Sequence, residues 1–181
     1  MPITPFHLGP AMLVKAACPR WFSLGAFALV QIAIDVESVA NILAGRYPIH
    51  DTLHTAAGAL VVAVLIVPVA RWSLPMLLRL LALGLSRVDG YPPSFRPHDR
   101  TRGWLALTVG AVVGALSHVA LDATMHADVR PLGAGNPLYV PGSFVLVHIV
   151  CLAAGLVGVA AWFVRVRHGG HRAGAMSIEG V

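Results

Sequence analysis

The chain alternates between long apolar stretches and short polar segments, a pattern typical of proteins built from membrane-spanning helices. Four stretches contain no Asp, Glu, Lys or Arg: residues 21–34, 52–70, 103–121 and 131–164. A helix needs about 20 mostly apolar residues to cross the hydrocarbon core of a bilayer. The pattern therefore predicts an all-α transmembrane bundle with four spans, at Trp21–Ala44, His54–Ala70, Gly103–His126 and Ser143–Val166.

Two shorter apolar segments accompany these spans. Residues 7–19 are expected to form a short N-terminal helix, because Pro19 interrupts the helix before the first span. The segment Leu74–Val88 is short and contains Arg79, so we predict an interfacial helix rather than a fifth span. We expect residues 1–166 to form one transmembrane domain and residues 167–181 to form a flexible C-terminal tail.

Composition narrows the class of protein. Hydrophobic residues make up 57% of the chain and charged residues only 12%, whereas about a quarter of the residues of a soluble domain are charged. This excludes a disordered protein and an ordinary soluble enzyme. The isoelectric point is near 10.0, but the basic residues lack the polar surface of a nucleic-acid-binding patch. The expected partners are therefore membrane lipids, and not nucleic acid.

The basic residues also predict an orientation in the membrane. Of the 13 Lys and Arg residues, only Arg46 and Arg130 lie on one side of the predicted bundle, and the other eleven lie on the opposite side. Because cytoplasmic loops carry an excess of Lys and Arg, the side with eleven positive charges is predicted to be cytoplasmic.

Ionisable residues inside the predicted spans form a polar layer. With a helical rise of about 1.5 Å per residue, they lie roughly 21–28 Å from the cytoplasmic ends of their spans, all at one depth near the opposite leaflet. Ionisable groups inside a membrane are costly, and they are functional candidates for that reason. The residues at this depth are Asp35, His54, His118, Asp122 and His148, and Glu37 and His126 lie in the same polar segments.

Sequence spacing within this layer favours a metal site. His50 and His54 are four residues apart, as are His118 and Asp122, so each pair can share one face of a helix. His126 continues the second series by a further turn. Two ligands at positions i and i+4 are a recurrent way for a helix to bind a metal ion.

The carboxylates of the first span and the N-terminal histidine need separate arguments. Asp35 and Glu37 are two residues apart and point about 160° away from each other on a regular helix. Either the helix is locally unwound, or one of them makes other contacts; we favour Asp35 as the ligand. If residues 7–19 form one arm of a helical hairpin, His7 returns to the polar layer, and otherwise it is an interfacial residue.

Imidazole and carboxylate ligands without a nearby thiolate suit Zn²⁺ first, and Mn²⁺ or Fe²⁺ next. Cys18 and Cys151 lie far apart and form no ligand pattern. A divalent ion lowers the pKa of its bound water and supplies hydroxide as a nucleophile. The predicted ligands are Asp35, His54, His118 and Asp122, with His7, His50 and His126 for a second ion. Glu37 and Asp128 are both candidates for the general base.

Several motifs resemble the YdjM-like family of predicted membrane-bound, metal-dependent hydrolases of bacterial inner membranes. They are TPFHLG, IDVES, HDTLHT and GALSHVALDATMHADVRPLGAGNPLYVP, in this order. The chain departs from the family pattern at Asp51, where Arg is common, and at Glu37, where Asp is usual. The resemblance implies a metal-dependent hydrolase of the inner membrane.

These observations predict hydrolysis of an ester or phosphoester in a lipid or lipid-linked substrate. The Gly/Pro-rich segment Pro131–Pro141 is either a loop over the site or a plain connector between spans. Two alternatives remain open. One is a transporter of metal ions or protons, which needs ionisable groups on both sides of the bilayer midplane. The other is a structural membrane protein whose polar layer joins the helices.

Overall fold

The computed structural model describes residues 5–85 and 103–175, and every regular element there is helical. Four of the helices are long and apolar enough to cross a membrane, at Leu24–Leu43, Ala56–Leu80, Trp104–Met125 and Phe144–Arg167. The predicted all-α architecture with four candidate spans and a short N-terminal helix is confirmed. The elements in chain order are η1 (Pro5–His7), α1 (Leu8–Ala17), α2 (Leu24–Leu43), η2 (Thr52–His54), α3 (Ala56–Leu85), α4 (Trp104–Met125) and α5 (Phe144–Ala175).

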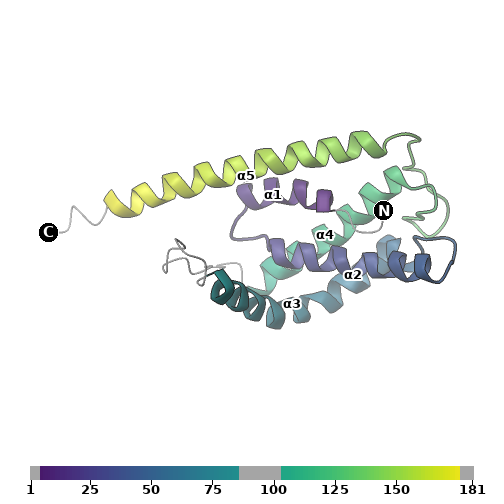
Figure 1. Cartoon of the computed structure of the whole chain (residues 1–181), viewed down its shortest axis with the longest axis horizontal. Helices are drawn as coiled ribbons and strands as arrows, with labels where there is room; N and C mark the ends of the chain where they lie inside the picture. Colours follow the sequence, from purple (N-terminus) through teal and green to yellow (C-terminus); the bar gives the residue numbers. More distant parts are fainter. Residues whose placement is uncertain (1–4, 86–102, 176–181) are drawn as a thin grey trace.

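The helices form a three-helix core and a peripheral pair (Figure 1). Helices α2, α3 and α4 pack against one another, and α1 lies along α5 on the outside of this group. The core between α2, α3 and α4 consists of small aliphatic side chains, which include Val30, Ile34, Ala63, Ala111 and Ala115. Small side chains allow the three helices to approach closely, and this brings their polar residues within contact distance.

The approach of α2 to α4 is fixed at the end of the bundle opposite the polar layer. The Ser23 hydroxyl caps α2 by accepting a hydrogen bond from the Ala26 N–H, and the Ser23 N–H donates to the Ala106 carbonyl at 3.1 Å. A Cβ atom on Gly110 would collide with the Ser23 carbonyl oxygen, and one on Gly114 would lie 3.0 Å from the Phe27 carbonyl oxygen. The two backbones therefore need glycine on α4 at these crossings.

Two boundaries differ from the sequence prediction. The predicted interfacial helix at Leu74–Val88 is wrong, because α3 continues without a break to Leu85. The residues between Ala70 and Leu74 include neither glycine nor proline, and Pro68 and Pro75 both lie inside α3 without ending it. Likewise α5 continues to Ala175, so the first part of the predicted tail is a continuation of this helix. Residues 86–102, which include four of the eleven basic residues on the predicted cytoplasmic side, lie outside the described residues.

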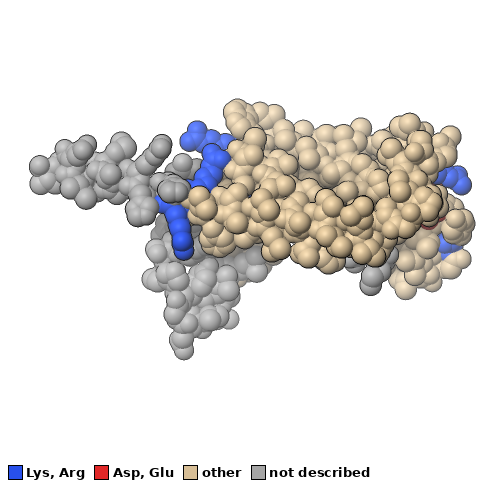
Figure 2. All heavy atoms as spheres, turned by 90° about the horizontal axis from the view of Figure 1, so that it is seen from above, with Lys and Arg blue, Asp and Glu red and all other residues tan. Residues whose placement is uncertain are grey.

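The charged surface agrees with a membrane-spanning orientation of the bundle. On the face shown in Figure 2, Lys and Arg gather at the two ends of the molecule, and the surface between them is uncharged. An uncharged band between charged ends matches a hydrocarbon core between two aqueous faces. The architecture is therefore that of a multi-pass membrane protein.

Candidate metal centre

Four buried side chains from three elements meet at one end of the α2–α3–α4 core. Asp35 comes from α2, His54 from η2, and His118 and Asp122 from successive turns of α4. Each offers one ligand atom, and these atoms all lie within 4.8 Å of one another. The structure thus brings together the four residues that the sequence analysis predicted as ligands of the first ion, and we call them the central cluster.

The spacing within the central cluster fits a tetrahedral metal ion. His118 Nε2 lies 3.4 Å from His54 Nε2, 3.4 Å from Asp35 Oδ1 and 3.3 Å from Asp122 Oδ2. His54 Nε2 lies 3.6 Å from Asp122 Oδ2 and 3.9 Å from Asp35 Oδ1. Tetrahedral ligands at about 2.0–2.1 Å from Zn²⁺ are separated from one another by about 3.3–3.4 Å.

The hydrogen bonds at Nδ1 of His54 and His118 determine whether their Nε2 atoms face the central cluster as donors or as acceptors. His54 Nδ1 lies 3.2 Å from Glu37 Oε2, and His118 Nδ1 lies 2.9 Å from Gln31 Oε1. Both partners are acceptors, so each Nδ1 carries the proton and each Nε2 keeps its lone pair. Two lone pairs and two carboxylates therefore face one another. These four atoms could hold a metal ion, and the acceptors behind the two histidines fix the orientation of the rings.

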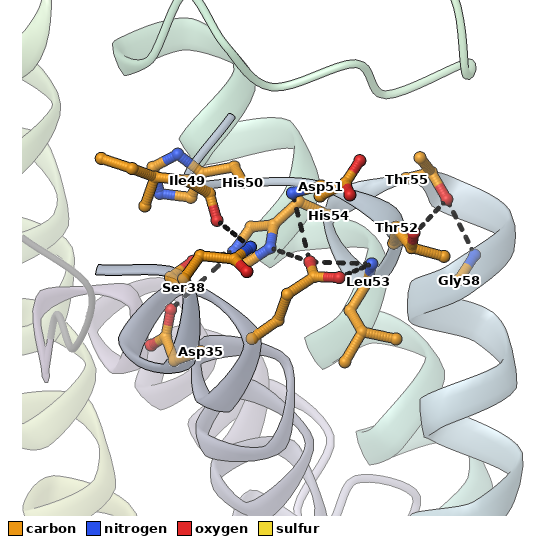
Figure 3. Close-up of polar contacts among 12 residues, drawn as sticks. Asp35, Ser38, Ile49, His50, Asp51, Thr52, Leu53, His54, Thr55 and Gly58 are labelled. Atoms are coloured by element: carbon orange, nitrogen blue, oxygen red, sulfur yellow. Dashed lines mark hydrogen bonds and ion pairs between the residues drawn. The ribbon is translucent and has the colours of Figure 1, made fainter. Parts of the chain in front are cut away.

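Glu37 also holds the segment that carries His54. Its carboxylate accepts hydrogen bonds from the Leu53 N–H at 2.9 Å and from the Asp51 N–H at 3.2 Å. Figure 3 shows the segment that carries these two N–H groups and His54. Asn41, one turn further along α2, donates to the Ile49 carbonyl at 3.0 Å. Because α2 fixes the segment at these points, His54 is held in place outside a regular helix.

The end of α2 and the start of α3 explain why this segment is not helical. Gly45 has a φ of +62°, its N–H donates to the Ile42 carbonyl, and the Arg46 N–H donates to the Asn41 carbonyl. This is the Schellman ending of a helix, which favours glycine at the left-handed position. The Thr55 hydroxyl then accepts from the Gly58 N–H at 3.0 Å and begins α3.

His7 lies beside the central cluster on the α1 side. Its Nε2 atom is 3.5 Å from Asp122 Oδ1, the oxygen that does not face the other ligands, and its Nδ1 atom is 3.3 Å from His118 Nδ1. Burial, with repulsion from His118, lowers the pKa of His7 to about 3. Burial and His118 likewise lower the pKa of His54, which precedes α3, to about 2. Both histidines are therefore neutral, as a metal ligand must be.

A second group, His50, His126 and Asp128, adjoins the central cluster, and we call it the outer cluster. The Asp128 carboxylate accepts from the Ile49 and His50 N–H groups at 3.0 and 3.1 Å, and His50 Nδ1 lies 3.1 Å from it. Burial raises the pKa of Asp128, but the hydrogen bonds from His50 outweigh this effect and hold the pKa below its usual range.

Ring contacts connect the two clusters. The His50 ring stacks on His126 with a centroid distance of 4.5 Å, and it meets the His54 ring edge-on at 4.7 Å. With Nδ1 of His50 occupied by Asp128, its Nε2 is the nitrogen left for a ligand. The outer cluster is less buried than the central one, so it lies between the central cluster and the outside of the bundle end.

The loop from α4 to α5 is tied to this end of the bundle. The Asn136 amide donates to the Ala123 and His126 carbonyls, each at 2.9 Å, and so satisfies the C-terminal end of α4. The Ala56 N–H donates to the Pro131 carbonyl at 2.8 Å, which joins the loop to the start of α3. The glycine-rich segment therefore has a defined conformation next to the clusters.

The local geometry differs from the predicted helix faces in two places. His50 and His54 do not share a helix face, because η2 and the preceding loop carry them. His126 does not continue the helical series, because α4 ends at Met125 and His126 has extended backbone angles. The α2 helix is regular at Asp35 and Glu37. Of the two alternatives, the structure therefore agrees with the one in which Glu37 makes other contacts, while Asp35 belongs to the central cluster.

Two polar residues of the site were not singled out from the sequence. Gln31 lies one turn before Asp35 on α2 and accepts from His118, and Ser38 lies 3.4 Å from His54 Nε2. Both are buried. The sequence did contain a signal for Gln31, which lies in the apolar run before Asp35. A single amide side chain inside a membrane span is rare unless it has a hydrogen-bonding partner. His148 is outside both clusters, and its ring N–H donates to the Phe144 carbonyl at 2.7 Å.

Comparisons with family models, with curated proteins and with solved structures found no match to this chain. The resemblance to the YdjM-like family therefore rests on the short motifs alone, while the fold and the two clusters rest on the structure. The four apolar helices and the buried His/Asp group are the features that any functional interpretation has to explain.

Proposed function

We propose that the protein is a membrane-embedded, metal-dependent hydrolase whose ion is held by Asp35, His54, His118 and Asp122. The observation that carries this proposal is the pair of Nε2 lone pairs facing two carboxylates at tetrahedral spacing. Zn²⁺ is the ion that best fits this donor set. When bound, such an ion polarises an oxygen of the substrate and lowers the pKa of a water ligand.

The chain's own residues supply the remaining parts of the proposed site. Glu37 and Gln31 orient the two histidines, and His7 supports Asp122 from behind. The outer cluster of His50, His126 and Asp128 is proposed to hold a second ion, with Asp128 as the acceptor that fixes the orientation of His50. Glu37 and Asp128 both remain candidates for the general base, because each carboxylate already accepts hydrogen bonds, Glu37 from Leu53 and Asp128 from Ile49 and His50.

The proposed substrate is an ester or phosphoester of a lipid or lipid-linked molecule. The clusters lie at one end of apolar helices, so a substrate anchored in the bilayer reaches them without leaving the membrane. The resemblance to the YdjM-like family favours a bacterial inner membrane. The basic residues favour an orientation with the clusters on the extracytoplasmic side.

The two alternative functions explain less of the structure. A transport path needs polar groups through the bilayer. Among the described residues of α2, α3 and α4, the buried side chains beyond Gln31 are apolar until Ser23 at the opposite end. A purely structural role needs donors and acceptors that satisfy each other. The central cluster instead brings two carboxylates and two Nε2 lone pairs together with the Ser38 hydroxyl as a donor to one of them, which costs stability unless a cation is bound.

Metal content is the first test of the proposal. Protein purified in detergent and dialysed against zinc is expected to retain at least one ion per chain by elemental analysis. Asp122→Asn and His118→Gln, which remove a ligand with little change in shape, are expected to lose it. His148→Gln is the matched control, because it changes a histidine outside both clusters. Metal-free wild type that stays folded and takes up no ion would refute the proposal.

Lipid hydrolysis is the second test. Metal-replete protein incubated with radiolabelled total membrane lipid is expected to release a headgroup or an acyl chain in a chelator-sensitive reaction. Asp122→Asn should abolish release, and His148→Gln should not. If no product forms from phospholipids or from lipid-linked sugars while the ion remains bound, the hydrolase assignment is wrong and metal binding alone is left.

A further inference from the structure

A cavity of about 300 Å³ lies between α1 and α5, on the outside of the three-helix core. Met12 of α1 and Leu152, Gly155 and Leu156 of α5 line it, and no charged side chain does. The lining positions on α5 run from Cys151 to Val159, along one face of the helix and within the span Phe144–Arg167. At about 1.5 Å per residue, this face is roughly 12 Å long.

Two glycines give the cavity its shape. Gly9 of α1 faces the backbone of α5, where an added Cβ would collide with the Cys151 carbonyl, and a Cβ on Gly155 would lie 3.2 Å from the Gly9 Cα. The helices therefore touch through their backbones at the floor of the cavity. The larger side chains of Leu152 and Leu156, which are 50% and 65% exposed, form its rim. The result is an apolar groove, which we call the α1/α5 groove.

One end of the α1/α5 groove adjoins the central cluster. Phe6 closes this end, and the next residue, His7, lies beside Asp122 and His118. The Phe6 ring also meets the His148 ring at a centroid distance of 5.1 Å. The end of a molecule bound in the groove therefore lies at Phe6. The neighbouring residue in the sequence, His7, contacts the proposed ligands Asp122 and His118.

We propose that the α1/α5 groove binds one hydrocarbon chain of the lipid substrate, with the polar end of that lipid directed toward the central cluster. The groove lies within the length of a candidate span, so acyl chains are the molecules that surround its open side. An extended chain fits a narrow apolar slot parallel to the helix axes. This inference rests on the proposed function for the role of the lipid, but the groove itself binds independently of any ion.

Photolabelling tests the groove directly. The protein is placed in phosphatidylcholine nanodiscs with a phosphatidylglycerol that carries a diazirine on one acyl chain, and the labelled peptides are identified by mass spectrometry. Adducts are expected at Met12 and Leu152, and excess unlabelled phosphatidylglycerol should suppress them. Leu156→Trp, which fills the groove, is expected to reduce these adducts about tenfold, the change that corresponds to ~1.4 kcal/mol of binding free energy.

Val157→Trp is the matched control, because Val157 neighbours Leu156, is 59% exposed and does not line the groove. It should leave the adducts unchanged. Labelling spread evenly around α5, or reduced equally by the two variants, means ordinary surrounding lipid and overturns the inference. The labelling is measured on both chelator-treated and metal-replete protein. Saturable labelling of the groove in both preparations, with no hydrolysis by the metal-replete protein, supports the groove while it refutes the hydrolase. Hydrolysis by metal-replete protein that Leu156→Trp leaves unchanged refutes the role of the groove in substrate binding alone.

Discussion

The tautomers of two histidines decide the chemistry of the central cluster. His54 and His118 are each held by an acceptor on Nδ1, a carboxylate in one case and an amide in the other. The Nε2 atoms then face Asp35 and Asp122 as lone pairs. A carboxylate behind a histidine also makes the imidazole a stronger ligand, so the two acceptors contribute to affinity as well as to geometry.

Replacing Glu37 by Gln should therefore weaken metal binding without removing a ligand. The amide keeps one acceptor for the segment around η2 but loses the charge that faces His54 Nδ1. We expect the zinc affinity to fall by about 10–100-fold, the usual effect of changing such a partner. Competition with a chromogenic chelator measures it. Asp51→Asn removes an exposed neighbouring carboxylate, and an equal loss in that variant would contradict the explanation.

His126 gives a prediction on the acid side. Burial, with repulsion from His50, lowers its pKa from 6.5 to about 4 in the folded protein. As pH falls below 6.5 the unfolded chain binds a proton at this residue while the folded chain does not, so stability is lost between pH 6.5 and about 4. In metal-free protein, His126→Gln should flatten the decline of melting temperature over this interval. An unchanged or steeper decline would contradict the assignment.

Among single residues, those that the sequence identified as candidates are ionisable residues within apolar segments. Asp35, His118 and Asp122 stand out because ionisable groups are rare inside apolar spans. Gln31 did not stand out, since an amide is a smaller anomaly and its partner is 87 residues away in sequence. The protonation state of His118 depends on that contact, and so no local pattern predicts it.

Helix ends, rather than helix faces, position much of the site. The spacing of His50 and His54 is compatible with a helix, but Gly45 ends α2 and Thr55 begins α3, which leaves both histidines in the connection. The four spans were predictable because each is a long apolar run. The connection was not, because its conformation depends on hydrogen bonds to Glu37 and Asn41 of another element.

The crossing of α2 and α4 allows a prediction about how the packing of helices affects the metal site. Gly110→Ala places a methyl group against the Ser23 carbonyl, at the crossing that sets the distance between the helices carrying Asp35 and His118. We expect a loss of about 1–3 kcal/mol, as for other overpacked interiors, and a weaker zinc affinity. Thermal unfolding in detergent measures the first effect. Gly103→Ala, with open space around the added atom, should cost only the smaller effect of replacing the N-cap glycine of α4 and should leave the zinc affinity unchanged.

For the whole molecule, the position of the clusters at one end of the bundle makes orientation a functional question. The central cluster lies at the end that carries η2 and the loop from α4 to α5, whereas α2 and α4 both begin at the opposite end. Arg165 donates to the Ala16 carbonyl at 2.7 Å, which places the C-terminal end of α1 at that opposite end as well. The substrate pool available to the site depends on which end faces the cytoplasm.

The excess of Lys and Arg at the end opposite the clusters predicts that this end is cytoplasmic. Cysteines introduced at Ala134, in the exposed loop beside the clusters, and at Gly103, before α4, distinguish the two orientations. The exposed Cys18 is first replaced by Ser, and Cys151 is buried. In intact cells, a membrane-impermeant maleimide should label Ala134→Cys and not Gly103→Cys, while permeabilised cells should show both. The reverse pattern would direct the clusters toward the cytoplasm, so that lipids of the inner leaflet would be the molecules that reach them.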